Sequence, residues 1–246
     1  MTNFKVGVTE RGDASVHLDE WKPKAGSVNA IIAITKSVTD ELSDFLARPE
    51  IKKKTILHAT VTGYGGTKLE PNVPKLETSW AKIQTLKAKD FPMEQVVLRI
   101  DPMIPTKNGG LQTIERVLET FKDSGISRVR FSFIQFYGHA NERLKKIGWP
   151  WPRFGEAEKE QAFLLMQKHL DTYTFSSCAT AVPERFANTA KQTGCVSEED
   201  LALLGMSHEL TGTSNQRPSC LCCSAKTELL SRRQPCKHGC LYCYWK

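Results

Sequence analysis

The cysteines of this chain are confined to its C-terminal part. The first 177 residues contain none, and all eight lie in the last 69, at positions 178, 195, 220, 222, 223, 236, 240 and 243. A segment of 177 residues is large enough to bury a hydrophobic core of its own, which excludes a small disulfide-rich scaffold. Cysteines clustered in this way are typical of metal ligands or of redox chemistry.

The rest of the composition is that of a globular protein rather than a disordered one, with 40% hydrophobic and 25% charged residues. No apolar run approaches the length that spans a membrane, so we expect no membrane association. No basic leader with an apolar core precedes the first expected strand, so we expect no signal peptide and a cytoplasmic protein. The formal net charge of +7 permits an anionic partner without requiring one, because the basic residues are scattered.

Apolar segments of strand length alternate with amphipathic segments of helix length. We expect strands at residues 4–9, 30–35, 55–62, 95–100, 128–136 and 173–177. We expect helices at residues 38–46, 74–88, 110–123 and 155–172. This alternation predicts right-handed βαβ units and a parallel sheet. Six strands are fewer than the eight of a closed barrel, so the expected fold is α/β, a partial (β/α)6 TIM-like barrel of parallel strands.

The pattern weakens after residue 180. Helical turns are expected at residues 184–191 and 198–204, and the chain from residue 206 onward is expected to be irregular. A long irregular segment is unusual in a compact domain unless something else holds it, and metal ligation would do so. We therefore expect a barrel over residues 1–180, with the cysteine-rich segment 181–246 packed on the same domain and folded over the barrel mouth.

Polar side chains gather where the expected strands end, and the carboxyl ends of the strands carry the active site in βα folds. These residues are Thr9, Arg11, Asp13, Thr35, Lys36, Thr62, Tyr64, Arg99, Asp101, Gln135, Tyr137 and Cys178. Of the two other histidines considered, His58 is expected in a strand and His139 in a loop.

The last three cysteines, Cys236, Cys240 and Cys243, have the spacing C-x3-C-x2-C. Three thiolates on one short loop can ligate three irons of a [4Fe–4S] cluster and leave the fourth iron open for chemistry. The alternative is a structural zinc site completed by a cysteine from residues 220–223. Structural zinc sites usually use paired C-x2-C knuckles, and this loop supplies one such pair, so we favour iron and sulfur.

The C-x3-C-x2-C spacing is the signature of radical S-adenosylmethionine (SAM) enzymes, which the chain resembles, and Tyr242 fits the aromatic residue preferred before the third cysteine. Residues 236–244 also look like the loop of spore photoproduct lyase-like proteins. The resemblance implies a [4Fe–4S] cluster on Cys236, Cys240 and Cys243, with SAM bound at the open iron. It further implies reductive cleavage of SAM to a 5′-deoxyadenosyl radical and an electron donor such as flavodoxin or ferredoxin.

Most of the chain is similar to an uncharacterised bacterial family, known only as a domain of unknown function, whose radical SAM cysteines lie at the C-terminus. The matching stretches are residues 62–65, 70–74, 99–102, 132–134 with Tyr137, 215–217, 220–222 and the terminal loop. Residues 9–13 look like a variant of the family's Arg-Arg-Thr-Asp segment, in which only Arg11 and Asp13 keep useful chemistry. Where relatives have Cys-Ala-Glu, this chain has Cys178-Ala-Thr, so no role for that glutamate is carried over.

The resemblance also suggests a second cluster. Relatives resemble this chain at Cys178, Cys195, Cys220 and Cys222, which together would ligate a second [4Fe–4S] cluster completely. The alternative is that they are ordinary buried cysteines. Cys223 is the remaining cysteine, for which three alternatives stay open: an alternative ligand, a hydrogen-atom donor or an inert residue.

Several of the strand-end residues have the chemistry to bind SAM or substrate. The glycines after Thr62 allow a close backbone approach, although a tight turn would explain them equally well. Arginine and lysine can neutralise a carboxylate or phosphate, and aspartate can accept from ribose hydroxyls or an amine. The residues expected to bind are Arg11, Asp13, Lys36, Thr62, Gly63, Tyr64, Gly65, Arg99, Asp101, Gln135, Tyr137 and Tyr242.

We therefore expect a radical SAM enzyme that acts on an unidentified anionic substrate, which is a small molecule, a peptide or a nucleic acid. One alternative is a spore photoproduct lyase-like enzyme that repairs or modifies nucleic acid. A second alternative is a non-catalytic zinc protein that binds nucleic acid.

Overall fold

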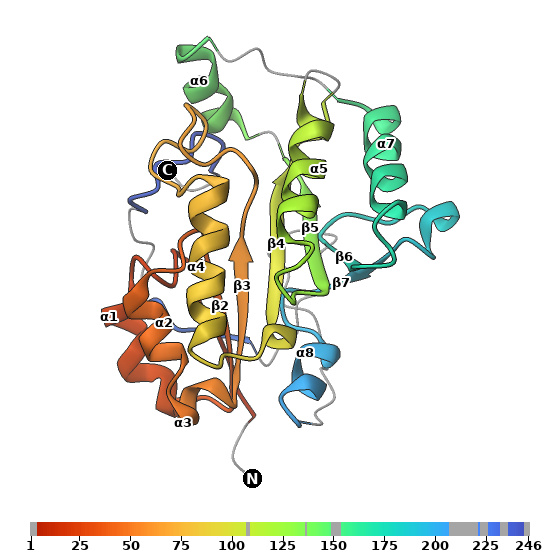
Figure 1. Ribbon diagram of the computed structural model, residues 1–246. Helices are drawn as coiled ribbons and strands as arrows, with labels where there is room; N and C mark the ends of the chain where they lie inside the picture. The colour runs from red at the N-terminus through yellow and green to blue at the C-terminus, as the bar shows by residue number, and fades with distance from the viewer. Residues whose placement is uncertain are drawn as a thin grey trace.

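The computed structural model describes residues 4–106, 109–135, 137–148, 154–206, 221, 226–231 and 236–243. These residues form one sheet of eight strands in the order β7-β6-β5-β4-β3-β2-β1-β8 (Figure 1). Every neighbouring pair is parallel. The strands are β1 (Val6–Val8), β2 (Ala30–Thr35), β3 (Thr55–Thr60), β4 (Val96–Met103), β5 (Arg128–Phe133), β6 (Thr174–Cys178), β7 (Ala190–Thr193) and β8 (Lys226–Glu228).

The prediction of an α/β fold with a parallel sheet is confirmed. The expected six strands all form, but the count of six is wrong, because β7 and β8 add a strand at each edge. The sheet does not close into a barrel. Helical turns over residues 184–191 are found only in part, since η3 (Glu184–Phe186) is followed by β7. The segment after residue 206, expected to be irregular, contributes β8.

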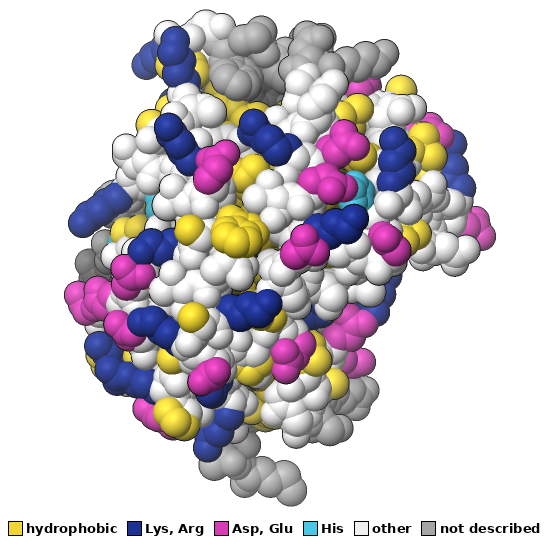
Figure 2. Space-filling model, in the orientation of Figure 1, with side chains coloured by type: hydrophobic (Ala, Val, Ile, Leu, Met, Phe, Trp, Pro, Cys, Tyr) yellow, Lys and Arg dark blue, Asp and Glu magenta, His cyan; other side chains and the backbone are white. Residues whose placement is uncertain are grey.

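The helices are α1 (Leu18–Trp21), α2 (Asp40–Leu46), α3 (Pro49–Lys52), α4 (Leu76–Ala88), α5 (Gly110–Phe121), α6 (Gly138–Lys146), α7 (Glu156–Gln167) and α8 (Glu198–Leu203), with 3-10 turns η1 (Lys22–Ser27) and η2 (Met93–Gln95). Helices α4, α5 and α7 cover one face of the sheet (Figure 1). Over this face basic and acidic side chains are interspersed (Figure 2), without a continuous basic surface that would suit a nucleic acid. No helix in the described ranges is long and apolar enough to cross a bilayer.

Both faces of the sheet are buried, which explains why the strands are apolar almost throughout. Alternate residues such as Leu57 and Leu98 join the large core beneath the helices. Their neighbours Ile56 and Val97 join a second core on the opposite face, where Leu201 of α8 also packs. We call this second side the inner face. Toward the carboxyl ends of the strands the inner face becomes polar.

Side-chain bonds hold the short strand β8 against β1. Lys226 Nζ donates to Glu10 Oε2 at 2.6 Å, and Glu228 Oε2 accepts from the backbone N–H groups of Glu10 and Arg11, both at 3.1 Å. These contacts replace the apolar alternation that a longer strand would have.

Candidate functional site

The cysteine loop, residues 236–243, packs against the connection between β3 and α4 (Figure 1). Leu241 N donates to Leu69 O at 3.0 Å, and Asn72 N donates to His238 O at 3.3 Å. The Asn72 side chain also donates to Lys237 O at 2.8 Å. The loop therefore lies at the carboxyl end of β3. This is the side of the sheet, formed by the carboxyl ends of the strands, where the sequence predicts the active site.

A buried ion pair between Asp13 and His238 fixes the first half of the loop. His238 Nε2 donates to Asp13 Oδ2 at 3.0 Å, and His238 Nδ1 donates to Asn72 O at 3.3 Å. Two donating nitrogens are the mark of the protonated imidazole. Burial opposes the charge on both side chains, but their mutual attraction holds the pKa of Asp13 below, and that of His238 above, the ordinary value.

The remaining lone pairs of Asp13 are used within the protein. Its carboxylate accepts from Thr35 Oγ1 at 2.8 Å, from Lys36 N at 2.7 Å and from Ser15 N at 2.9 Å. Asp13 was predicted to accept from the ribose or amine of a cofactor. In the structure this aspartate ties the end of β2 to the cysteine loop, and its role toward a cofactor stays a prediction.

Glu70 fixes the second half of the loop. Its carboxylate is fully buried and accepts from Lys36 Nζ at 2.8 Å, from Thr62 Oγ1 at 2.6 Å and from the hydroxyl of Tyr242. Lys36 Nζ also lies 5.5 Å from the centre of the Tyr242 ring. Burial disfavours the charged carboxylate, but Lys36 outweighs it and lowers the pKa of Glu70. Three predicted residues thus meet at Glu70.

Helix α6 and a glycine complete the docking of the loop. Arg143 Nε donates to Leu241 O at 3.0 Å, and the same guanidinium also donates to Cys243 O. Gly239 has a φ of +65°, in the left-handed region that glycine enters without steric cost. It lets the backbone reverse between Cys236 and Cys240.

The three loop thiols are half-buried and close enough for their charges to interact. Burial raises the pKa of Cys236 to about 11 and that of Cys240 to about 12, and the other loop thiols add to both shifts, whereas Lys36 opposes them. Deprotonation of Cys236 and Cys240 near neutral pH would therefore need the positive charge of a bound metal. Within the described ranges no group of three or more His, Cys, Asp or Glu side chains that could hold a metal ion is found.

Arg99 and Asp101 lie on the inner face, in the middle and the carboxyl-terminal half of β4, and they form an ion pair. Ser132 Oγ of β5 donates to Asp101 Oδ1 at 2.5 Å. Burial disfavours the charge of Arg99, but Asp101, Cys195 and Cys178 together raise its pKa. Asp101 also acts on the charge of Lys36, as Cys240 does, and both raise the pKa of Lys36.

The glycines after β3 are explained by the packing of the chain against itself. A Cβ atom on Gly65 would lie 1.9 Å from Pro74 O, and one on Gly63, whose φ is +82°, would lie 2.5 Å from Thr113 Cγ2. Tyr64 between them is half-buried, and burial raises its pKa to about 12. The tight-turn interpretation accounts for both glycines without a ligand.

Other predicted residues lie elsewhere. Arg11 is exposed, and its bond to Glu228 comes from its backbone N–H. Gln135 is exposed and accepts from Tyr137 Oη at 2.9 Å. His139 stacks on Tyr137 with ring centres 5.9 Å apart, and it lies in α6 rather than in the expected loop, whereas His58 lies in β3 as predicted. Cys220 and Cys222 lie outside the described residues.

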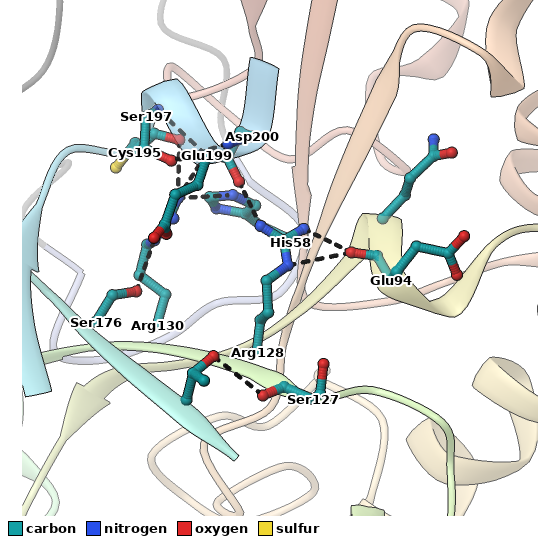
Figure 3. Close-up of polar contacts among 12 residues, drawn as sticks. His58, Glu94, Ser127, Arg128, Arg130, Ser176, Cys195, Ser197, Glu199 and Asp200 are labelled. Carbon is teal, nitrogen blue, oxygen red and sulfur yellow. Dashed lines mark hydrogen bonds and ion pairs between the residues drawn. The ribbon is translucent and has the colours of Figure 1, made fainter. Parts of the chain in front are cut away.

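A second buried polar network lies on the inner face (Figure 3). Arg130 Nη1 donates to Asp200 Oδ2 and to Cys195 O, both at 3.1 Å, and Arg128 Nη1 donates to Asp200 Oδ1 at 2.7 Å. His58 Nε2 is 3.2 Å from Arg130 Nη1. Burial and the charge of Arg130 hold the pKa of His58 well below its ordinary value, so His58 is neutral and accepts this bond. The network ties α8 and Cys195 to the sheet.

Glu70, His238 and Arg143 were not predicted as site residues. Glu70 and His238 stand in stretches that match the resembled family, so the available signals were a glutamate eight residues after Thr62 and a histidine between two cysteines of the terminal motif. No local pattern pointed to Arg143, because its helix was not expected.

Comparison with known proteins places the chain at the level of a family. A search of curated proteins finds no match. The sequence model of one family, described as Domain of unknown function (DUF1848), matches residues 11–245, which is nearly the whole chain. The chain therefore belongs to the DUF1848 family.

Proposed function

We propose that this protein is a radical SAM enzyme, in which Cys236, Cys240 and Cys243 hold a [4Fe–4S] cluster with SAM at its open iron. The open parallel sheet would serve as a partial (β/α) barrel beneath that site. The substrate is an anion, as the net charge of +7 suggests, and an external donor such as flavodoxin or ferredoxin supplies the electron.

The docking of the cysteine loop at the strand ends carries this proposal. The anchored residues alternate with the cysteines, since His238 lies between Cys236 and Cys240 and Tyr242 lies between Cys240 and Cys243. Each anchor reaches a buried carboxylate on a different segment of the chain. The backbone at each cysteine is therefore fixed relative to the sheet, as a preorganised ligand set requires.

The donor set fits a thiolate-ligated cluster in its chemistry. Three cysteines lie on one short loop, a glycine with positive φ lets that loop curl, and the Lys36 ammonium acts on Cys240. Bound there, the cluster would supply the electron that cleaves the sulfonium of SAM and an open iron for the methionyl group. Lys36 would offset the negative charge of the thiolates while Glu70 holds it in place.

Anaerobic reconstitution with iron and sulfide tests the proposal. We expect about four irons per loop site and broad absorption at about 400 nm. With dithionite and SAM, 5′-deoxyadenosine should accumulate. The variant Cys240→Ser should lose 5′-deoxyadenosine formation and about four of the bound irons. The control Glu77→Gln, which changes an exposed residue of α4, should keep both.

A colourless protein that binds zinc alone and forms no 5′-deoxyadenosine would overturn the proposal in favour of a zinc-binding protein. If SAM is cleaved, a steeply salt-dependent affinity for DNA or RNA would identify the substrate as nucleic acid.

A further inference from the structure

Cys178 and Cys195 form a pair of neighbouring thiols beside β6 and β7, at the edge of the sheet opposite β8. Cys178 is the last residue of β6, and Cys195 follows the end of β7 by two residues. Because Cys178 is in register with Thr193 of β7, the two cysteines meet at the carboxyl ends of adjacent strands. Both are buried, and their Sγ atoms lie 3.4 Å apart.

In the structure this separation is that of a hydrogen bond between two thiols, and it suits two ligands of one metal better than a disulfide. A disulfide bond would bring the sulfurs to about 2.05 Å. Two thiolates bound to one tetrahedral metal at about 2.3 Å each lie about 3.8 Å apart, as follows from the tetrahedral angle. The observed 3.4 Å is close to the second value.

The backbone around the pair is held firmly. Arg130, itself buried and paired with Asp200, donates to Cys195 O at 3.1 Å. Ala179, directly after Cys178, has a φ of +56°. A non-glycine residue in this region costs on the order of 1 kcal/mol and persists only where its surroundings fix it. The strand pairing and the arginine thus set the positions of both thiols before any ligand binds.

Charged groups of both signs act on the pair, because Glu10 interacts with Cys195 and Arg99 interacts with both cysteines. The Arg99 guanidinium interacts electrostatically with both Cys178 and Cys195, and its carboxylate partner is Asp101. An arginine stays protonated, so this cation remains beside the sulfurs whatever they bind.

We propose that Cys178 and Cys195 are paired thiolate ligands of a second soft-metal centre, separate from the Cys236–Cys243 loop. The centre takes a thiophilic metal that binds both sulfurs, as a zinc ion or as one iron of a [2Fe–2S] cluster, and each thiol releases its proton on binding. The pair supplies two of the ligands. The proposal does not depend on SAM chemistry, since it concerns a different set of cysteines.

The loop variant Cys236→Ser/Cys240→Ser/Cys243→Ser isolates this second centre in the full chain. The variant is loaded with Zn²⁺ in one arm and anaerobically with Fe²⁺ and sulfide in the other, desalted, and analysed for metal content. We expect it to retain metal, with X-ray absorption showing sulfur at about 2.3 Å. Visible absorption in the second arm would identify an iron–sulfur cluster, and retention of zinc alone would identify a zinc ion.

Adding Cys178→Ser/Cys195→Ser to the loop variant should abolish metal retention, whereas adding Glu77→Gln, which changes an exposed residue of α4, should not. Circular dichroism of each variant reports whether it is folded.

A loop variant that holds neither zinc nor iron would overturn the proposal, and this result does not require the pair variant to fold. Metal retained in full after removal of both cysteines would also overturn it, as would a Cys178–Cys195 disulfide detected by mass spectrometry in protein isolated under reducing conditions. Failure of the proposed function looks different, because it is judged by SAM cleavage in the protein with an intact loop.

Discussion

Replacing Asp200 by asparagine should destabilise the protein in a way that depends on pH. The Asp200 carboxylate is fully buried between Arg128 and Arg130, and it also accepts from Ser197 at the start of α8. Asp200→Asn keeps the shape and one acceptor oxygen but removes the negative charge. Arg130 would then be a buried cation without its carboxylate partner.

The magnitude follows from the charges. Burial opposes ionisation, but the charges of Arg130 and Arg128 outweigh it and lower the pKa of Asp200 from 3.8 to about 2. At 1.4 kcal/mol per pKa unit this shift corresponds to about 2 kcal/mol of folding free energy. Breaking a buried pair by removing one partner costs about 3 to 5 kcal/mol, and we expect the lower end because asparagine still accepts a bond.

The sign of the pH dependence is fixed by the direction of the shift. A carboxyl whose pKa is lowered in the folded state stabilises the protein above its unfolded pKa, and this contribution is lost as pH falls from about 4 to about 2. The difference in unfolding free energy between wild type and Asp200→Asn should therefore be about 3 kcal/mol at pH 7 and should shrink by about 2 kcal/mol at pH 2.

Urea unfolding followed by far-UV circular dichroism at a series of pH values measures this difference. The control is Glu199→Gln, which changes the adjacent residue of the same helix. Glu199 is exposed, and within the described residues its ion pair is with the exposed Lys191. Loss of this surface ion pair should lower the unfolding free energy by less than about 1 kcal/mol. A difference for Asp200→Asn that is equal at pH 7 and pH 2 would refute the reasoning, because the effect would then not come from the charge.

Two further substitutions test the docking of the loop and the turn after β3. Glu70→Gln removes the charge that balances the buried Lys36 ammonium and should lower iron retention by the loop cysteines, measured after desalting, whereas the exposed Glu77→Gln should leave it unchanged. Equal iron retention in both variants would contradict the positioning role. Gly65→Ala brings a Cβ to 1.9 Å from Pro74 O and should lower the unfolding free energy by about 2 kcal/mol or more, while Gly26→Ala, which meets nothing within 4 Å, should change it little, as thermal unfolding can show.

The elements that were predicted correctly carry their own pattern. Strand β2 is an apolar run between polar segments, and α5 has a clear apolar stripe, so local sequence determines both. Helix α6 buries only Ala140 and Leu144 among its described side chains and has no stripe to recognise. Strands β7 and β8 are short, polar and at the edges of the sheet, where pairing rather than apolar alternation forms them.

The candidate site was predictable in one respect and not in another. The rule that polar residues gather at the carboxyl ends of parallel strands selected Asp13, Lys36 and Thr62, which all take part in docking the cysteine loop. It did not select their partners. Glu70 lies inside a connection, and His238 is 225 residues from Asp13, so no local signal relates the two ends of that bond.

The long sequence separations of these contacts determine the order in which parts of the protein can fold during synthesis. Asp13 binds His238, which is synthesised 225 residues later, and Glu70 binds Tyr242, 172 residues later. Strand β1 pairs on one side with β8, which begins at Lys226. The strands from β2 to β6 and the helices between them can form while the chain is still being synthesised, because these βα units are contiguous in sequence. The cysteine loop can dock only after almost all the intervening chain has been synthesised. Delivery of the cluster that we propose for this loop would therefore follow the docking of the loop. A nascent chain halted before Cys236 would expose Asp13 and Glu70 without the residues that bury them.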